Sequence, residues 1–140
     1  MPSAAAPSIL CVIDFSDSSL RAIQWSIPEA RRHNLHISIL YPYRLDQLRK
    51  RDDVVQSKKA IDLEALEKFE RLGGSLLKEG QVSFDFHSEV GFIRDRIQEH
   101  TRKNNVVLLV MSKKIAGSES FQELIDEIDV PVVIVPPKKR

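Results

Sequence analysis

The 140-residue sequence has little of several features that would commit it to a specialised class of protein. Its single cysteine, Cys11, lies in an apolar run, which excludes a disulfide framework and favours a reducing compartment. No apolar segment reaches the roughly 18 residues of a transmembrane helix, and the first residues lack the basic and apolar regions of a secretory signal. We therefore expect a cytoplasmic protein that does not contact a membrane.

An excess of charge of one sign is also missing. The 21 Lys and Arg residues nearly balance the 20 Asp and Glu residues, so the formal charge is +1 and no strong field attracts nucleic acid. The sequence lacks a cysteine pair, a His-Glu-x-x-His motif and a Gly-x-Ser-x-Gly motif. We therefore expect no nucleic-acid partner, no metal site and no enzymatic activity.

What the sequence does contain is an alternation of short apolar runs and helical patterns. Five expected strands span 9–13, 37–41, 82–87, 106–111 and 130–135. The fourth run is apolar throughout, which is typical of a strand covered on both faces, whereas the third alternates apolar with polar residues. Alternation in the third run and Pro131 in the fifth favour positions at the two edges of a sheet.

The segments between these runs have the apolar spacing of helices. The first expected helix starts at Asp17 and should bend at Pro28, because proline removes an intrahelical hydrogen bond. The expected apolar faces of the four helices comprise Leu20, Ile23, Ile27 and Ala30; Ala65, Leu66, Phe69, Leu72 and Leu76; Phe92, Ile93 and Ile97; and Phe121, Leu124, Ile125 and Ile128. Residues 42–58 are either a solvated loop or the polar start of the second helix.

Strand–helix alternation predicts an α/β fold with a doubly wound five-stranded parallel sheet in the order 3-2-1-4-5. A single domain over 8–136 would carry a flexible tail at 1–7 and a basic tail at 137–140. In such sheets ligands bind beyond the carboxyl ends of the strands, where the strand order reverses. The expected site is bounded by Asp14-Phe15-Ser16, by Tyr41 and by the stretch from Met111 to Ser118.

Two segments resemble a known family. Residues 9–34, ILCVIDFSDSSLRAIQWSIPEARRHN, are similar to the opening strand and helix of universal stress proteins, and 130–136, VPVVIVP, resemble their closing strand. The sequence SEVG at 88–91 and a fourth strand ending at Met111 follow in the family's order. The resemblance covers nearly the whole chain and is weakest over 42–80.

This resemblance implies an adenine nucleotide alpha hydrolase-like fold, usually in a dimer, and a family in which some members hold ATP and others do not. In the members that bind, an acidic residue at the end of the first strand contacts the nucleoside, which matches Asp14. A residue at the end of the second strand lines the adenine pocket, which matches Tyr41. After the fourth strand, a loop of the form Gly-x-x-Gly, nine residues and Gly-Ser/Thr cradles the phosphates with its amides.

The sequence departs from this family pattern after its fourth strand. Ser112 stands where the first glycine is expected, no second glycine follows, and the pair Gly117-Ser118 comes only five positions later. Close approach of a backbone to phosphate favours glycine and needs several converging amides, so we expect no tight binding of ATP. Gly117 and Ser118, with Lys113 and Lys114 nearby, either hold one phosphate or form only a capped turn with solvated lysines.

The expected function follows from these features. The fifth strand, through Val132, Val133, Ile134 and Val135, would expose an apolar edge that a second copy can cover in a homodimer. We expect a regulatory or stress-response homodimer without tight ATP binding. The alternative is a stress sensor that binds ATP or AMP in an adenosine pocket at Asp14, Tyr41 and Met111 with a shortened phosphate loop. The sequence does not identify a protein partner.

Overall fold

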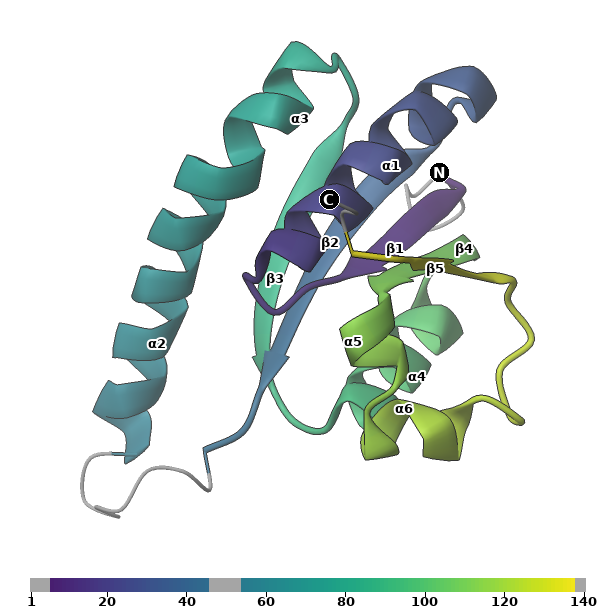
Figure 1. Ribbon diagram of the computed structural model, residues 1–140. Helices are drawn as coiled ribbons and strands as arrows, with labels where there is room; N and C mark the ends of the chain where they lie inside the picture. Colours follow the sequence, from purple (N-terminus) through teal and green to yellow (C-terminus); the bar gives the residue numbers. More distant parts are fainter. Residues whose placement is uncertain (1–5, 46–53, 138–140) are drawn as a thin grey trace.

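The computed structural model describes residues 6–45 and 54–137 (Figure 1). In chain order its elements are β1 (Ser8–Val12), α1 (Asp17–His33), β2 (His36–Tyr43), α2 (Val54–Phe69), the π-helical turn η3 (Glu70–Gly74), α3 (Ser75–Glu79), β3 (Phe84–Val90), α4 (Ile93–Lys103), β4 (Val106–Ser112), α5 (Lys113–Ala116), α6 (Glu119–Leu124) and β5 (Val132–Val135). The predicted tails at 1–7 and 137–140 fall mostly outside the described residues.

The five strands form one sheet in the order β3-β2-β1-β4-β5, and each neighbouring pair is parallel. This order confirms the doubly wound α/β prediction and places β3 and β5 at the edges. β5 starts only after Pro131, and β3 runs to Val90, three residues beyond its expected end. β2 likewise continues through Pro42 to Tyr43, so the predicted irregular segment begins later than position 42.

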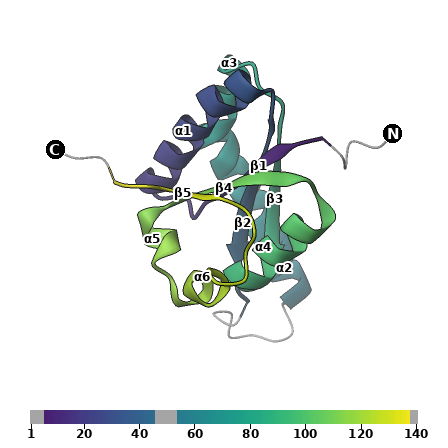
Figure 2. The ribbon, with the colours of Figure 1, turned by 90° about the vertical axis from the view of Figure 1, so that its right-hand side faces the viewer.

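Helices cover the two faces of the sheet and build two cores. Alternate residues of β1 contribute to each: Ile9 and Cys11 pack with α1 on one face, whereas Leu10 and Val12 pack with α4, α5 and α6 on the other. Both sets are essentially inaccessible to solvent. This two-sided burial explains why β1 reads as an unbroken apolar run. Figure 2 shows the helical layers on either side of the sheet.

Helix α1 begins where the sequence predicts. Ser16 is its N-cap, and the Ser16 hydroxyl accepts a hydrogen bond from the amide of Ser19. The helix ends at Asn34, which adopts a left-handed conformation with φ 57°. Pro28 lies on the exposed side of an uninterrupted helix, and the bend expected there stays a prediction.

The second helical segment departs from the predicted apolar face. Leu66 and Leu72, which were expected to be buried, are 42% and 44% exposed. Leu72 lies within η3, where a π-helical turn adds backbone and shifts which side chains face the sheet, whereas Leu66 precedes this turn and lies beside the buried side of α2 that Ala65 and Phe69 form. Gly73 permits close packing there, since a Cβ atom at this position would lie 3.0 Å from Cδ1 of Ile23.

Two other predicted helical faces are only partly buried. The Phe92 side chain, at the N-cap of α4, is 45% exposed, and Ile125 just after α6 is 40% exposed. Helix α6 is short because it ends at Leu124, whereas Phe121 and Leu124 are fully buried as expected. Among the described helices, none is long and apolar enough to cross a membrane.

Candidate functional site

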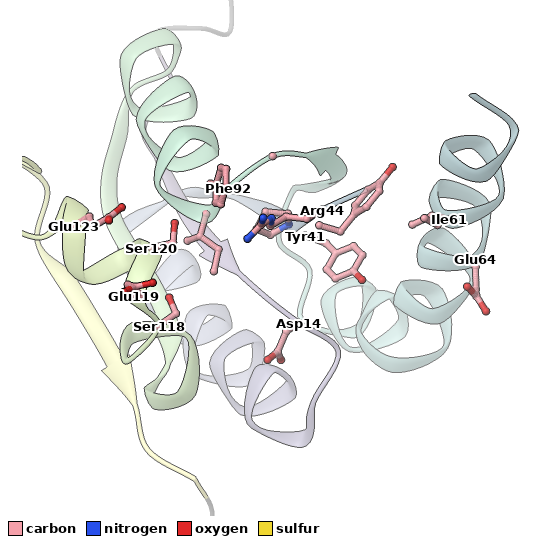
Figure 3. A pocket seen from close by; sticks show the side chains of 14 residues that line it. Asp14, Tyr41, Arg44, Ile61, Glu64, Phe92, Ser118, Glu119, Ser120 and Glu123 are labelled. Carbon is pink, nitrogen blue, oxygen red and sulfur yellow. The ribbon is translucent and has the colours of Figure 1, made fainter. Parts of the chain in front are cut away.

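A pocket of about 680 Å³ opens at the carboxyl ends of β1 and β2 (Figure 3). It is bounded by the ends of these strands, by α2 on one side and by the starts of α4 and α6 on the other. Three of the predicted site residues, Asp14, Tyr41 and Ser118, line it. Because Asp14 follows β1 and Ser118 follows β4, the pocket extends to the point between these strands where the order reverses, as a doubly wound sheet leads us to expect.

Asp14 lines the pocket, and its two carboxylate oxygens differ in their partners. Oδ1 accepts hydrogen bonds from the Ser16 amide at 3.1 Å, the Ser16 hydroxyl at 2.6 Å and the Ser19 hydroxyl at 2.7 Å. Oδ2 contacts only Lys114 Nζ, at 3.7 Å, among the described residues. Burial raises the pKa of Asp14, but the hydrogen bonds from Ser16 and Ser19 and the charge of Lys114 outweigh it and lower the pKa. Asp14 is therefore an ionised acceptor with Oδ2 available.

Tyr41 forms part of a row of aromatic rings beside Asp14. Its ring centroid lies 4.7 Å from that of Phe15 and 5.7 Å from that of Tyr43, the second pair being stacked. Phe15 adopts φ 66° and packs against the core beneath α1, so it supports Tyr41 and does not line the pocket. Burial, followed by the charge of Asp14, raises the pKa of Tyr41, which stays a neutral hydroxyl.

The stretch after β4 folds into two short helices. Met111 and Ser112 are fully buried, and the Ser112 hydroxyl accepts a hydrogen bond from the Ile115 amide at 3.3 Å. The Gly117 amide donates to the Lys113 carbonyl and the Ser118 amide to the Ile115 carbonyl, each at 3.0 Å. These amides, which in a phosphate loop would point at a ligand, are thus used within the chain.

The closing Gly-Ser pair also serves the helices. Gly117 has φ −81°, a conformation open to any residue, and is the C-cap of α5. Ser118 is the N-cap of α6, because its hydroxyl accepts from the Phe121 amide at 3.3 Å. Neither Lys113 nor Lys114 lines the pocket, and the Lys114 side chain is 74% exposed.

Several lining residues were missed by the sequence analysis. Glu64 of α2 and Glu119 and Glu123 of α6 join Asp14, so the walls carry four carboxylates. The cationic side chain in the lining is Arg44, whose guanidinium lies 4.1 Å from the Phe92 ring centroid. No sequence motif marks these residues, since they come together only when α2 and α6 face each other across the strand ends.

A carboxylate on α2 fixes that helix as one wall of the pocket. Oδ1 of Asp62 accepts hydrogen bonds from the Tyr43 hydroxyl at 2.8 Å and the Ser88 hydroxyl at 2.7 Å, and Oδ2 contacts Lys58 Nζ at 2.9 Å. The adjacent Ile61 lines the pocket. Asp62 thereby ties α2 to β2 and β3 and sets the width of the site.

Within the described part of the chain no group of three or more side chains is arranged to hold a metal ion.

Comparisons with known proteins place this fold in a family. The model of the universal stress protein family matches residues 7–136. A search of the curated proteins finds no match. Among solved structures, the hypothetical protein MJ0577 superposes with a TM-score of 0.78 at 18% identity, over 95% of this chain and 97% of that one.

Two further structures are also similar. The universal stress protein UspA from Lactobacillus plantarum matches with a TM-score of 0.69 at 16% identity, over 94% of this chain and 98% of that one. A universal stress protein family member from Arabidopsis thaliana with AMP bound matches with a TM-score of 0.67 at 16% identity, over 94% and 92%. These likenesses show the predicted adenine nucleotide alpha hydrolase-like fold, and the family match spans nearly the whole sequence. The chain belongs to the universal stress protein family.

Proposed function

We propose that this chain is a regulatory universal stress protein of the cytoplasm that acts as a homodimer, by binding and without catalysis, and does not bind ATP tightly. The observation that carries the proposal is the use of the Ile115, Gly117 and Ser118 amides inside the chain. A row of phosphates needs several amides that converge on it. If these three amides turned toward a ligand, their present hydrogen bonds would be lost, at about 1 kcal/mol each, and α5 would unwind.

The charges of the pocket also oppose a polyphosphate. Four carboxylates and one guanidinium line the walls, so an ATP molecule would bring its negative charges into an acidic environment. Two like unit charges 8 Å apart repel by about 2 kcal/mol at an effective dielectric constant of 20, before screening by salt. The ion pairs of Glu123 with Arg94, at 3.0 Å, and of Asp14 with Lys114, at 3.7 Å, offset two of the carboxylates only in part.

A second candidate function is an adenine-nucleotide sensor that takes a nucleoside or a monophosphate. It is favoured by Oδ2 of Asp14, which contacts Lys114 Nζ at 3.7 Å but has room to accept a ribose hydroxyl, beside the Tyr41 ring. A volume of about 680 Å³ lies within the range of small-ligand pockets. The Arabidopsis thaliana structure with AMP bound supports a ligand of this class. In this proposal the nucleoside is held and the phosphates contribute little.

Calorimetric titration with adenosine, AMP, cyclic AMP, ADP and ATP separates the two functions. The first proposal predicts no submillimolar binding of ATP. The second predicts that affinity does not rise from adenosine to ATP and that Asp14→Ala abolishes binding. Asp17→Asn is the matched control, because Asp17 lies in the first turn of α1 outside the pocket lining. Submillimolar ATP binding that exceeds adenosine binding would contradict both.

The homodimer proposal is supported by the position of β5 at the edge of the sheet. β5 pairs with β4 on one side, and Ile134 on it is 46% exposed, although Val135 is buried and Val132 and Val133 pack against the cores. An apolar edge strand of this kind is stabilised when a second copy covers it. Ile134→Glu should therefore halve the mass measured by light scattering. Ile125→Glu, at a similarly exposed apolar residue away from β5, is the control, and an unchanged mass for Ile134→Glu would contradict the proposal.

A further inference from the structure

Helix α2 presents an apolar surface to solvent on the side away from the sheet. Leu63 is 65% exposed and Leu66, at the margin of the buried side, is 42% exposed, whereas Ala65 and Phe69 are 3% exposed and pack inward. Figure 1 shows α2 along the outer side of the molecule, next to β3. Exposed leucines one helical turn apart form a continuous patch, since residues three positions apart are neighbours on a helix.

Charged residues of opposite sign flank this patch along the helix axis. Lys59 lies one turn before Leu63, and Glu70 lies one turn after Leu66, at the junction with η3. Both side chains are exposed, and neither forms an ion pair within the part of the chain that the structure describes. We call this set, Lys59, Leu63, Leu66 and Glu70, the outer face of α2.

We propose that the outer face of α2 binds the same face of a second copy, with the two helices antiparallel about a two-fold axis. Under such an axis centred between Leu63 and Leu66, Leu63 meets Leu66 of the second copy and Lys59 meets Glu70 of the second copy. Each contact then occurs twice, as an isologous interface requires. The charges of the outer face are therefore complementary to those of a second copy.

The charges also select the direction of pairing. In a parallel arrangement Lys59 would face Lys59 and Glu70 would face Glu70, which repel each other. In the antiparallel arrangement both pairs attract, and the four leucines are removed from water between them. The distance from Lys59 to Glu70 along the helix is about 16 Å at 1.5 Å per residue, so the contact is small and the association weak.

This surface is distinct from the proposed β5 interface. α2 lies beside β3 at one edge of the sheet, whereas β5 forms the opposite edge. A single copy can therefore use both surfaces at once, and two-fold contacts through α2 would join β5-linked dimers into larger assemblies. Weak contacts gain effective strength when each assembly offers more than one of them.

The test uses charge reversal, which keeps the exposed helix intact. Sedimentation analysis over a range of protein concentrations compares wild type with Lys59→Glu, with Glu70→Lys, with their equimolar mixture and with the double variant. Each single variant places like charges together twice, so we expect its association through α2 to weaken at least about tenfold. The equimolar mixture and the double variant restore opposite pairs and should regain association.

The exposed pair Lys78→Glu and Glu79→Lys at the end of α3 is the matched control and should leave association unchanged. The same series is repeated on an Ile134→Glu background, which removes the β5 contact and leaves α2 pairing measurable. On that background Leu63→Ser removes an apolar contact of the outer face, and association should weaken. Far-ultraviolet circular dichroism verifies that each variant is folded. Single variants that associate as wild type does, or a mixture that associates no better than either single variant, would overturn the proposal.

Discussion

Replacing Asp62 by alanine removes the carboxylate that ties α2 to the sheet. Its three partners respond differently, because they differ in their access to water. The Tyr43 residue is 9% exposed, so its hydroxyl would lose its hydrogen-bond partner in a largely buried position. This loss would lower the free energy of unfolding by about 1–3 kcal/mol. The half-buried Ser88 hydroxyl and the exposed Lys58 together contribute about 1 kcal/mol.

The expected loss in the free energy of unfolding for Asp62→Ala is thus about 3 kcal/mol, a fall in Tm of roughly 10 °C for a domain of this size. Asp62→Asn should cost only about 1 kcal/mol, because an amide oxygen still accepts from both hydroxyls while the Lys58 ion pair is lost. Tyr43→Phe removes the main partner, so its effect and that of Asp62→Ala should not add in a double-mutant cycle.

The effect should also depend on pH. Burial raises the pKa of Asp62, but hydrogen bonds from Lys58, Ser88 and Tyr43 outweigh it, so the pKa in the folded protein lies below the usual value of 3.8. A lowered folded pKa contributes stability above the unfolded pKa, and that contribution is lost as the pH falls below 3.8 through the folded value. Asp62→Asn should remove this part of the acid sensitivity.

Urea unfolding followed by circular dichroism measures these differences. Asp126→Ala, at an exposed carboxylate just after α6, is the matched control and should change stability by less than about 0.5 kcal/mol. The reasoning would be refuted if Asp62→Ala were as stable as wild type, or if Asp62→Asn were as damaging as the alanine variant.

Three further predictions concern other parts of the molecule. Gly91→Ala should lower stability by about 1–2 kcal/mol in thermal unfolding, because Gly91 has φ +144° and a Cβ there would lie 2.9 Å from Nε of Arg96; equal Tm values would contradict this. The hydrogen bond to Asp85 raises the pKa of His87, so protonated His87 stabilises the fold, by less than about 1 kcal/mol at this half-exposed site. His87→Gln should lose all of this stability below pH 6.5 and none of it once the pH has risen through the folded pKa. A stability difference between wild type and variant that grows with pH would have the wrong sign. Burial raises the pKa of Cys11 to about 12, so a disulfide reagent should modify it only as fast as the protein unfolds, whereas rapid labelling of the native protein would count against the buried position.

The sheet was predictable because its signal is repeated along the chain. Each strand is a short apolar run, and the difference between the runs at β4 and β3 is enough to separate a central strand from an edge. Capped helix starts near Asp17 and Ser118 were also predictable, since a side-chain acceptor before an apolar-periodic segment has a local cause, and the structure assigns the caps to Ser16 and Ser118.

The π-helical turn and the acidic walls of the pocket could not be predicted in this way. The pair Gly73-Gly74 reads as an interruption of the helix, but in the structure it allows the helix to widen and pack against Ile23. Glu64 and Glu119 are ordinary exposed helical residues in the sequence, and they share a pocket only through the packing of α2 and α6 around the strand ends. Such properties depend on tertiary contacts between segments far apart in the chain.

The central claim is that the amides after β4 are used within the chain and do not hold the phosphates of ATP. Its most direct test follows the backbone amides of Ile115, Gly117 and Ser118 by NMR during a titration with ATP. Because these amides donate hydrogen bonds within the chain, we expect any change of their resonances at millimolar ATP to be no larger than the change that adenosine causes by occupying the pocket that Ser118 lines. Saturable shifts of all three amides at submillimolar ATP, with little response to adenosine, would contradict the account.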